Sequence, residues 1–427
     1  MDNKVYYYWK MVINTDISFL EEKLMDESLA IFQTILSAIT LYYIFISIFS
    51  LRKKREDYTD PPTKSFAIVI AAHNEEKVIG ELLKSIWQLN YPRELFEVFV
   101  VADNCTDNTA KIARSLNATV FERFNKNQKG KGYALEYGFK KIFSLPRKFD
   151  AFLVLDADNL ISSNFLTIMN CRLNRGEQII QGYLDTKNPD DTWVSRSICV
   201  GYMITNRFWQ LAKHNLGLSC ALGGTGMCIE SSVLKRFGWG MTSLTEDLEF
   251  QTKALLCNLR VSWAHDAVVY DEKPLTLKQS WRQRQRWMQG HCSVANQYFL
   301  KLFWQGIVGR NFRMIDGAIY LLQPYYTMGL GLTLFLSFLF HPDYLNFYWF
   351  GVSFAVQYLY LGLALLLEKA PRKAYLWLLY YPFFTLTWIP VAFAGFIYRN
   401  HKHWDHTQHV RNISYEFLRK QTQPGRS

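Results

Sequence analysis

The sequence predicts an α/β domain with a mostly parallel sheet, joined on both sides to apolar α-helices long enough to cross a membrane. Two observations carry this prediction. Short apolar runs rich in β-branched and aromatic residues alternate with helical patterns between residues 66 and 155. Long stretches without a charged residue lie before and after the more polar middle of the chain.

Three apolar runs predict the buried strands: residues 66–72 (FAIVIAA), 96–102 (FEVFVVA) and 151–155 (AFLVL). Helical patterns at 77–89 and 107–116 follow the first and second of them. Strands that alternate with helices form parallel sheets covered on both faces, and such sheets bind ligands beyond the carboxyl ends of the strands. We therefore expect the functional site where these three runs end.

Four stretches carry no charged residue over a membrane-spanning length: 29–50, 317–340, 344–367 and 374–398. About 20 apolar residues cross a bilayer core, so each stretch is a candidate transmembrane helix. The alternative of buried core helices fits four such runs poorly. Basic residues at 52–55 follow the first stretch, and the positive-inside rule then places the polar region after them in the cytosol.

These signals predict a multi-pass protein of the cell membrane with a cytosolic α/β domain. Three crossings after that domain would put the basic tail outside, against the positive-inside rule. Either one C-terminal run is a hairpin or interfacial segment, or the tail breaks the rule; Pro382 and Pro390 make 374–398 the more irregular run. The expected parts are an N-terminal segment (1–28), a transmembrane helix (29–50), the α/β domain (52–272), interfacial amphipathic helices (273–312), about three transmembrane helices (313–398) and the tail (399–427).

Charge and cysteine content narrow the class of protein. The formal net charge is +11, but the basic residues concentrate beside the apolar stretches, where they can face anionic lipid headgroups. We therefore expect a lipid bilayer and not a nucleic acid as partner. The seven cysteines are scattered and form no C-x-x-C pair, which argues against a disulfide framework or a zinc site and suits a reducing compartment.

Polar residues follow all three predicted strands. His73, Asn74 and Glu75 follow the first, Asp103 the second, and Asp156-Ala-Asp158 the third. Two carboxylates this close repel each other unless a divalent cation lies between them and a ligand's phosphates, which suits Mg²⁺ or Mn²⁺. The alternative is a solvated Asx turn. Neither G-x-G-x-x-G after the first strand nor a P-loop motif occurs, so dinucleotide and P-loop binding lose support.

Two later segments also carry chemistry. Ser243-Leu-Thr-Glu246-Asp247 fits either a helix capping box or a general base, Asp247, presented at the rim of a cleft. Gln283, Arg286 and Trp287 share one face of a predicted helix. That face suits a diphosphate and a sugar ring, or else an interfacial helix with arginine at the headgroups.

Together these segments resemble the membrane-embedded family 2 glycosyltransferases, which include cellulose, hyaluronan and poly-N-acetylglucosamine synthases. The resemblance covers about residues 65 to 290 closely, and the spacing of TED and Q-x-x-R-W is its most specific feature. The matching elements, in the family's order, are IVIAAHNEE (68–76), VVADNCTD (100–107), KGYAL (131–135), DAD (156–158), GGTGMCI (223–229), TED (245–247) and QRQRW (283–287).

The resemblance implies a GT-A fold, which has a Rossmann-like, mostly parallel sheet, and an inverting hexosyl transfer from a nucleotide sugar with Mg²⁺ or Mn²⁺. Asp247 would be the base, with Glu246 beside it, and Asp158 with Asp156 would bind the metal. The donor would be held by His73, Asn74, Glu75, Asp103, Lys131, Asp156, Gln283 and Arg286, and the acceptor by Trp287, Gly224 and Thr225.

The expected reaction is transfer from a UDP-sugar, UDP-N-acetylglucosamine before UDP-glucose by family prevalence, to a growing β-linked polysaccharide at the membrane. A second hypothesis is the addition of a single sugar to a polyprenyl-phosphate or glycolipid acceptor. A third, from a different class, is a non-catalytic membrane scaffold or permeation protein that keeps a sugar-binding fold. Clustered charges at the strand ends argue against the third hypothesis.

Overall fold

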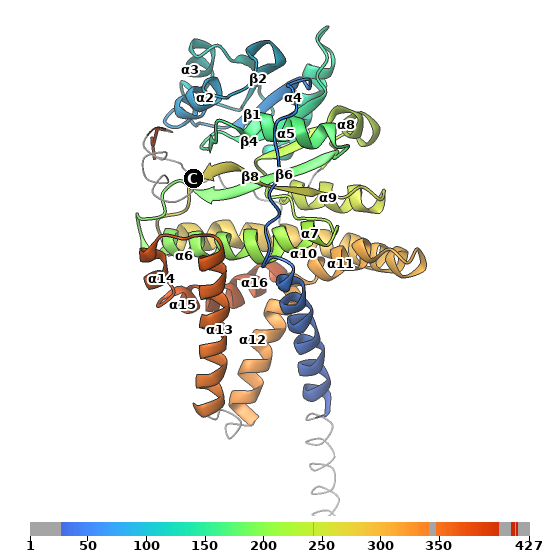
Figure 1. Cartoon of the computed structure of the whole chain (residues 1–427), viewed down its shortest axis with the longest axis vertical. Helices are drawn as coiled ribbons and strands as arrows, with labels where there is room; N and C mark the ends of the chain where they lie inside the picture. Colours follow the sequence, from blue (N-terminus) through green and yellow to red (C-terminus); the bar gives the residue numbers. More distant parts are fainter. Residues whose placement is uncertain (1–26, 242, 341–346, 401–410, 415, 417–427) are drawn as a thin grey trace, which may run out of the picture.

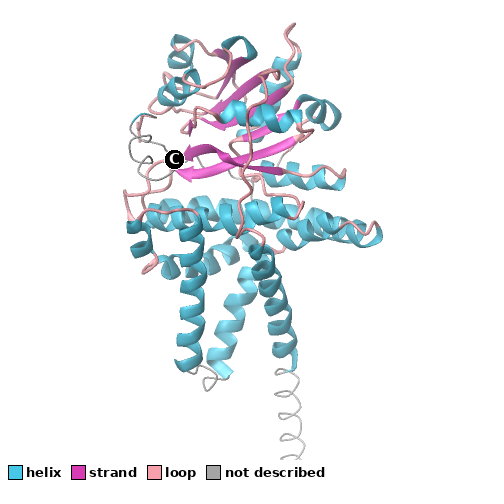
Figure 2. Cartoon of the chain, viewed as in Figure 1, coloured by secondary structure: helices cyan, strands magenta, loops and turns pink. Residues whose placement is uncertain are grey.

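The computed structural model describes residues 27–241, 243–340, 347–400, 411–414 and 416. Three layers follow one another along the long axis of the molecule (Figure 1). All strands lie in the α/β layer at the top, a second layer of helices lies across its base, and long helices project from the base (Figure 2). Residues 1–26 of the predicted N-terminal segment, and most of the predicted tail, lie outside the described residues.

In the described chain, eight strands form one sheet in the order β3-β2-β1-β4-β7-β6-β8-β5. β1 to β4 run parallel, as do β6 and β8, whereas β7 and β5 run antiparallel to their neighbours. The three predicted strands are confirmed as β1, β2 and β4. The bounds are β1 Phe66–Ala72, β2 Phe96–Asp103, β3 Thr119–Arg123, β4 Ala151–Asp156, β5 Leu160–Ile161, β6 Ile179–Thr186, β7 Met227–Glu230 and β8 Ser262–Asp271.

Helices cover both faces of the sheet, as the alternating pattern predicts. Ile68 and Ile70 of β1 belong to a core shared with α2, α3 and α5, whereas Ala67 and Val69 belong to a core shared with α4, α8 and α9. The helix bounds are α2 Ile79–Trp87, η1 Arg93–Leu95, α3 Thr109–Ser115, α4 Lys131–Phe143, α5 Phe165–Asn174, α8 Ser231–Phe237 and α9 Glu246–Leu256.

The base layer contains the segment expected as several interfacial helices. That segment, 273–312, holds one long helix, α10, of 32 residues. Thr276 and Gln279 form a reciprocal capping box at its start, which explains why the helix begins there. The base layer consists of α6 Trp193–Ile204, the π-helix Thr205–Leu211, α7 Ala212–Asn215, α10 Leu277–Val308, α11 Phe312–Leu321, α14 Arg372–Trp377, α15 Tyr381–Leu386 and α16 Trp388–Ile397.

Three helices project from the base: Glu27–Ile48, α12 (Gln323–Phe340) and α13 (Phe347–Leu367) (Figure 1). Of the helices in the described chain, Glu27–Ile48 alone has both the length and the apolar composition that a membrane crossing needs. Large apolar side chains are exposed on all three, including Ile31, Leu41 and Phe45 on the first, Leu334 and Phe338 on α12, and Val356 and Leu359 on α13.

Two of the predicted membrane helices, 317–340 and 374–398, are not single helices. The first breaks at Leu322, between α11 and α12. Pro324 has no N–H to donate to the carbonyl of Tyr320, and His291 Nε2 lies 3.1 Å from that oxygen instead.

The second run divides into α14, α15 and α16 for a similar reason. Pro382 leaves the carbonyl of Leu378 without its helical donor, and the hydroxyl of Tyr358 donates to it at 2.8 Å. This run lies within the base layer, and Arg411, which follows it in the sequence, contacts the α/β domain. The backbone N–H of Arg411 donates to Glu272 at 3.1 Å and its guanidinium to Asp191 at 2.8 Å.

Candidate active site

The D-x-D carboxylates lie in the turn at the end of β4, and hydrogen bonds to Asn159 and Thr225 stabilise this turn. The N–H of Asp156 donates to Asn159 Oδ1 at 3.0 Å and to Thr225 Oγ1 at 3.1 Å. The side chain of Asp156 is 36% exposed, whereas Asp158 is 2% exposed. Asp158 Oδ2 accepts the N–H of Glu272, at the end of β8, at 3.2 Å. One carboxylate is therefore open and the other enclosed.

Thr225, expected beside the acceptor, is a support of this turn. Its hydroxyl is buried and donates to Asn159 Oδ1 in addition to accepting the Asp156 N–H. Lys187, which the local pattern did not single out, also contacts this turn. Its buried Nζ donates to the backbone carbonyl of Asp158 at 3.1 Å.

Lys131 joins the D-x-D turn to the TED segment. It is the first residue of α4, its Nζ forms an ion pair with Asp156, and it donates to the Gly224 carbonyl at 2.7 Å. Glu246 Oε1 lies 4.0 Å away. Burial lowers the pKa of Lys131, but the charges of Asp156 and Glu246 outweigh this effect and raise the net pKa. The ammonium group therefore stays charged at the centre of the site.

The capping-box interpretation of Ser243 and Glu246 is wrong. α9 begins at Glu246 after Thr245, with no side-chain cap, and Ser243 instead donates its N–H to Glu249 at 3.0 Å. Glu246 and Asp247 thus occupy the first turn of α9, where the helix dipole favours negative charge. The general-base hypothesis for Asp247 therefore does not compete with a capping box at Ser243.

The pKa of Asp247 lies well above that of an ordinary aspartate. Burial and the neighbouring charge of Glu246 raise its pKa to about 7, although the Leu248 N–H, 2.8 Å from Oδ1, and Lys131 act in the opposite direction. Gly224, at a φ of 77°, approaches so closely that a Cβ there would lie 3.4 Å from Asp247 Oδ2. A general base works best when its pKa lies near the working pH.

The helix α10 brings the Q-x-x-R-W segment close to the TED segment. α10 meets the TED segment at Gly290, where a Cβ would lie 2.5 Å from Thr245 Oγ1. Arg286 lies close enough to lower the pKa of Glu246, although burial and the net effect raise it. Trp287 is half-buried against the apolar cluster between α10, α12 and α16. Gln283 lies one turn before Arg286 and is half-buried.

The residues expected to hold the nucleoside connect the loops after β1 and β2. His73 Nδ1 donates to the Asp103 carbonyl at 2.7 Å. Asn74, at a φ of 56°, accepts the N–H of Thr106 at 2.8 Å. The N–H of Glu75 donates to a hydroxyl at the start of α3 at 2.8 Å. These residues lie together at the carboxyl ends of the strands, beside the D-x-D turn on β4.

The carboxylate of Asp103 has a protein partner that the sequence pattern did not indicate. Arg123, at the end of β3, donates to Asp103 Oδ1 at 2.5 Å and to the Gln128 carbonyl at 2.9 Å. Burial raises the pKa of Asp103 even though Arg123 opposes the rise. This ion pair joins the end of β3 to the end of β2.

The carboxylates of Asp156 and Asp158 fit a divalent cation whose remaining ligands are phosphate oxygens of a bound substrate and water. Within the described residues, no three His, Cys, Asp or Glu side chains converge into a metal site made of protein alone. Mg²⁺ is typically held by one or two carboxylates and completes its shell with substrate phosphates and water. Two carboxylates at one strand end therefore match an ion of this kind.

A test of how α10 positions the site follows from its contact with Thr245. Gly290→Ala would place a methyl group 2.8 Å from the Thr245 backbone nitrogen, so α10 must shift. We expect a loss of stability of about 1–3 kcal/mol, measured by thermal unfolding in detergent. Gly362→Ala is the matched control, because no atom outside its own helical turn lies within 4 Å, and it should not lower the stability.

Comparison with known proteins assigns the chain to a family. The model of the family described as "Glycosyltransferase like family 2" matches residues 61–290, more than half of the chain. The chain belongs to glycosyltransferase family 2. Membership of family 2, which the motifs predicted, is thus confirmed for the matched residues.

Two curated relatives and one solved structure illustrate the likeness. The probable glycosyltransferase YdaM of Bacillus subtilis (strain 168) is 28% identical over 268 residues, 60% of this chain and 61% of that protein. A poly-beta-1,6-N-acetyl-D-glucosamine synthase of Staphylococcus epidermidis is 25% identical over 283 residues, 63% of this chain and 64% of that protein. The chain thus spans less than two thirds of the length of these relatives.

A solved mannosyltransferase from Pyrobaculum calidifontis, in complex with GDP-Man and Mn²⁺, shares the fold of this family 2 chain. Its TM-score is 0.55 at 17% identity, and the match covers 87% of this chain and 99% of the mannosyltransferase. The sheet of the family 2 domain, mainly parallel and covered on both faces, is consistent with a GT-A fold.

Proposed function

We propose that this chain is a membrane-embedded, inverting glycosyltransferase that moves a sugar from a UDP-sugar to a growing β-linked polysaccharide. The observation that carries the proposal is the convergence of Lys131, Asp156, Glu246 and Asp247 at one end of the sheet. UDP-N-acetylglucosamine is the favoured donor and UDP-glucose the next. The named activity of the Staphylococcus epidermidis relative supports this order.

In the proposed reaction, the acceptor hydroxyl gives its proton to Asp247 while its oxygen attacks the anomeric carbon. The bond between that carbon and the diphosphate oxygen breaks, and UDP leaves with the electron pair. A single displacement inverts the carbon, so an α-linked donor gives a β-linked product. Arg286 and Lys131 place positive charge beside the departing diphosphate.

A divalent cation held by Asp156 and Asp158, Mg²⁺ or Mn²⁺, would neutralise charge on the diphosphate when bound. His73, Asn74, Glu75 and Asp103 would surround the uridine, and Gln283 would lie with Arg286 on the diphosphate side. Trp287 and Gly224 would lie on the acceptor side of the base. Thr225 acts in this scheme through its support of the D-x-D turn.

The raised pKa of Asp247 predicts a pH dependence. The base must be ionised to accept a proton, so kcat/KM should rise with pH through about 7 and level off above it. We would measure UDP release against pH at low donor concentration. A kcat/KM that stays constant from pH 5.5 to 8 would contradict the assignment of Asp247 as the base.

The proposed membrane arrangement has three crossings: the helix Glu27–Ile48, α12 and α13. Their exposed apolar side chains support it, as does the basic run at 52–55. The short helices α14 to α16 would lie at the interface. The tail then begins on the cytosolic side with the α/β domain, in agreement with the positive-inside rule and with the contacts of Arg411.

The experiment that tests the function is UDP release by the purified full-length protein in detergent, with Mg²⁺ or Mn²⁺, across a panel of UDP-sugars. The products are then sized. One active donor with a product of high mass supports the polymer synthase. A product with one added sugar on a polyprenyl-phosphate or glycolipid would favour the single-addition alternative. No UDP release with any donor and acceptor would contradict the proposal and favour the scaffold.

A further inference from the structure

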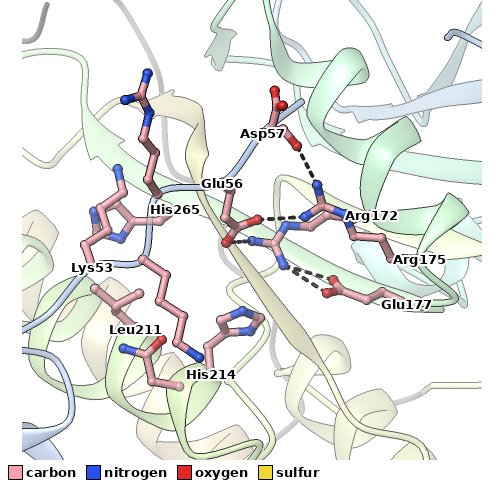
Figure 3. Close-up of a pocket in the computed structure, with 12 residues that line it drawn as sticks. Lys53, Glu56, Asp57, Arg172, Arg175, Glu177, Leu211, His214 and His265 are labelled. Carbon is pink, nitrogen blue, oxygen red and sulfur yellow. Dashed lines mark hydrogen bonds and ion pairs between the residues drawn. The ribbon is translucent and has the colours of Figure 1, made fainter. Parts of the chain in front are cut away.

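A pocket lies at the opposite end of the sheet from Asp156 and Asp158. It has a volume of about 340 Å³ and opens between the chain after the helix Glu27–Ile48, the end of α5, the π-helix and α7 (Figure 3). β4 and β6 are both antiparallel to β7, so β4, β6 and β8 point the same way. Glu177, just before β6, and His265, near the start of β8, therefore mark the amino edge of the sheet. The pocket is separate from the candidate active site.

One wall of this pocket is formed by ion-paired side chains. Arg172 is 1% exposed, and its guanidinium donates to Glu177 at 3.0 Å and to Glu56 at 2.6 Å. Arg175 donates to the other oxygen of Glu56 at 3.3 Å (Figure 3). Two half-buried carboxylates, Glu56 and Glu177, thus hold Arg172, and Glu56 also holds Arg175.

The mouth of the pocket carries cations that the wall does not neutralise. Lys54 and Arg55 line it, are exposed, and form no ion pair with any described residue. In total five lysine or arginine side chains line the pocket against three carboxylates. Burial, together with the charges of Arg172, Arg260 and Lys54, lowers the pKa of His214 to about 4. This histidine is therefore neutral and does not add to the charge of the pocket.

The position of the pocket indicates which anion it meets. Lys54 and Arg55 follow within a few residues of Ile48, the last residue of the apolar helix. Asn215 of α7 fixes the intervening turn, because its amide donates to the carbonyls of Phe49 and Arg52 at 2.8 and 3.1 Å. If that helix crosses the bilayer, the pocket opens at the level of the lipid headgroups on the domain's side.

We propose that this pocket binds the phosphate of an anionic lipid headgroup, an inference that rests on the proposed membrane arrangement. The phosphate oxygens would accept charge-assisted hydrogen bonds from Lys54 and Arg55. The lipid would then fix the α/β domain against the membrane surface through a site that takes no part in the transfer reaction. Inorganic phosphate shares the recognised chemistry, so the test includes both sources.

The experiment uses the full-length chain in neutral detergent micelles. Native mass spectrometry counts the phosphatidylglycerol or phosphatidylcholine molecules retained per chain during a titration. We expect one phosphatidylglycerol to be retained in preference to phosphatidylcholine, and the double variant Lys54→Gln, Arg55→Gln to weaken this binding by roughly tenfold. The matched control is Lys235→Gln, Arg236→Gln, an exposed basic pair on α8, which should bind like the wild type.

Three results would overturn the proposal. They are equal retention of the two lipids, unchanged phosphatidylglycerol binding by the Lys54/Arg55 variant, or binding of inorganic phosphate with no retained lipid. Lys54 and Arg55 are exposed, so this variant should unfold at the same temperature as the wild type, which verifies that it folds. Neither thermal unfolding nor lipid retention needs turnover, so failure of the proposed function would be seen separately in the assay of UDP release.

Discussion

Asp247→Asn should lower sugar transfer by about a thousandfold while UDP-sugar binding stays close to that of the wild type. Asparagine has nearly the same shape, and its side-chain oxygen can still accept the Leu248 N–H, which lies 2.8 Å from Asp247 Oδ1. It cannot take up the proton of the acceptor hydroxyl. We would measure UDP release and, separately, donor binding by calorimetry.

Asp266→Asn is the matched control for this variant. Asp266 lies on β8 at the amino edge of the sheet, is partly exposed, and pairs with Lys53 instead of any residue of the candidate site. The control should transfer sugar at the wild-type rate. Turnover by Asp247→Asn within a few-fold of the control would exclude Asp247 as the base, and Glu246 would be the next residue to test.

Asp158→Asn should lower kcat/KM by about a hundredfold and remove the effect of Mn²⁺ on UDP binding. The change keeps the size of a side chain that is nearly enclosed and accepts the Glu272 N–H, so the fold should be preserved. It removes the negative charge that a divalent cation requires. Calorimetric titration of UDP with and without Mn²⁺ measures the loss independently of turnover.

Removal of the metal from the wild type should give the same result as this variant. We expect a chelator to stop UDP release and added Mg²⁺ or Mn²⁺ to restore it. Wild-type activity that is indifferent to chelation would refute the metal role of Asp158 and Asp156, while leaving the role of Asp247 intact. Asp266→Asn again serves as the control for the change from carboxylate to amide.

The largest difference between sequence and structure concerns the apolar runs. Composition alone predicts helices over 317–340 and 374–398, since neither run contains a charge. The structure breaks them near Pro324 and Pro382, where His291 and Tyr358 bond to the carbonyls that the prolines leave without a donor. Those partners lie on other helices, so the sequence around each proline could not indicate them.

The local sequence pattern was sufficient to predict the strands β1, β2 and β4 and the position of the carboxylates that follow them. A run of β-branched and aromatic residues must be buried on both faces, and polar residues at its carboxyl end then lie at the edge of the sheet. The order of short motifs along the chain was likewise sufficient for the family. These features depend on residues that are neighbours in sequence.

Only the tertiary structure decided how the site works electrostatically. The pairing of Asp103 with Arg123 joins two strands, and the pKa of Asp247 near 7 depends on burial beneath segments distant in sequence. Two other contacts also join residues that are distant in sequence: α10 approaches Thr245 at Gly290, and Arg411 binds Glu272 of the α/β domain. Sequence periodicity shows which face of an element is buried, but charge interactions and burial depend on which distant segments that face meets.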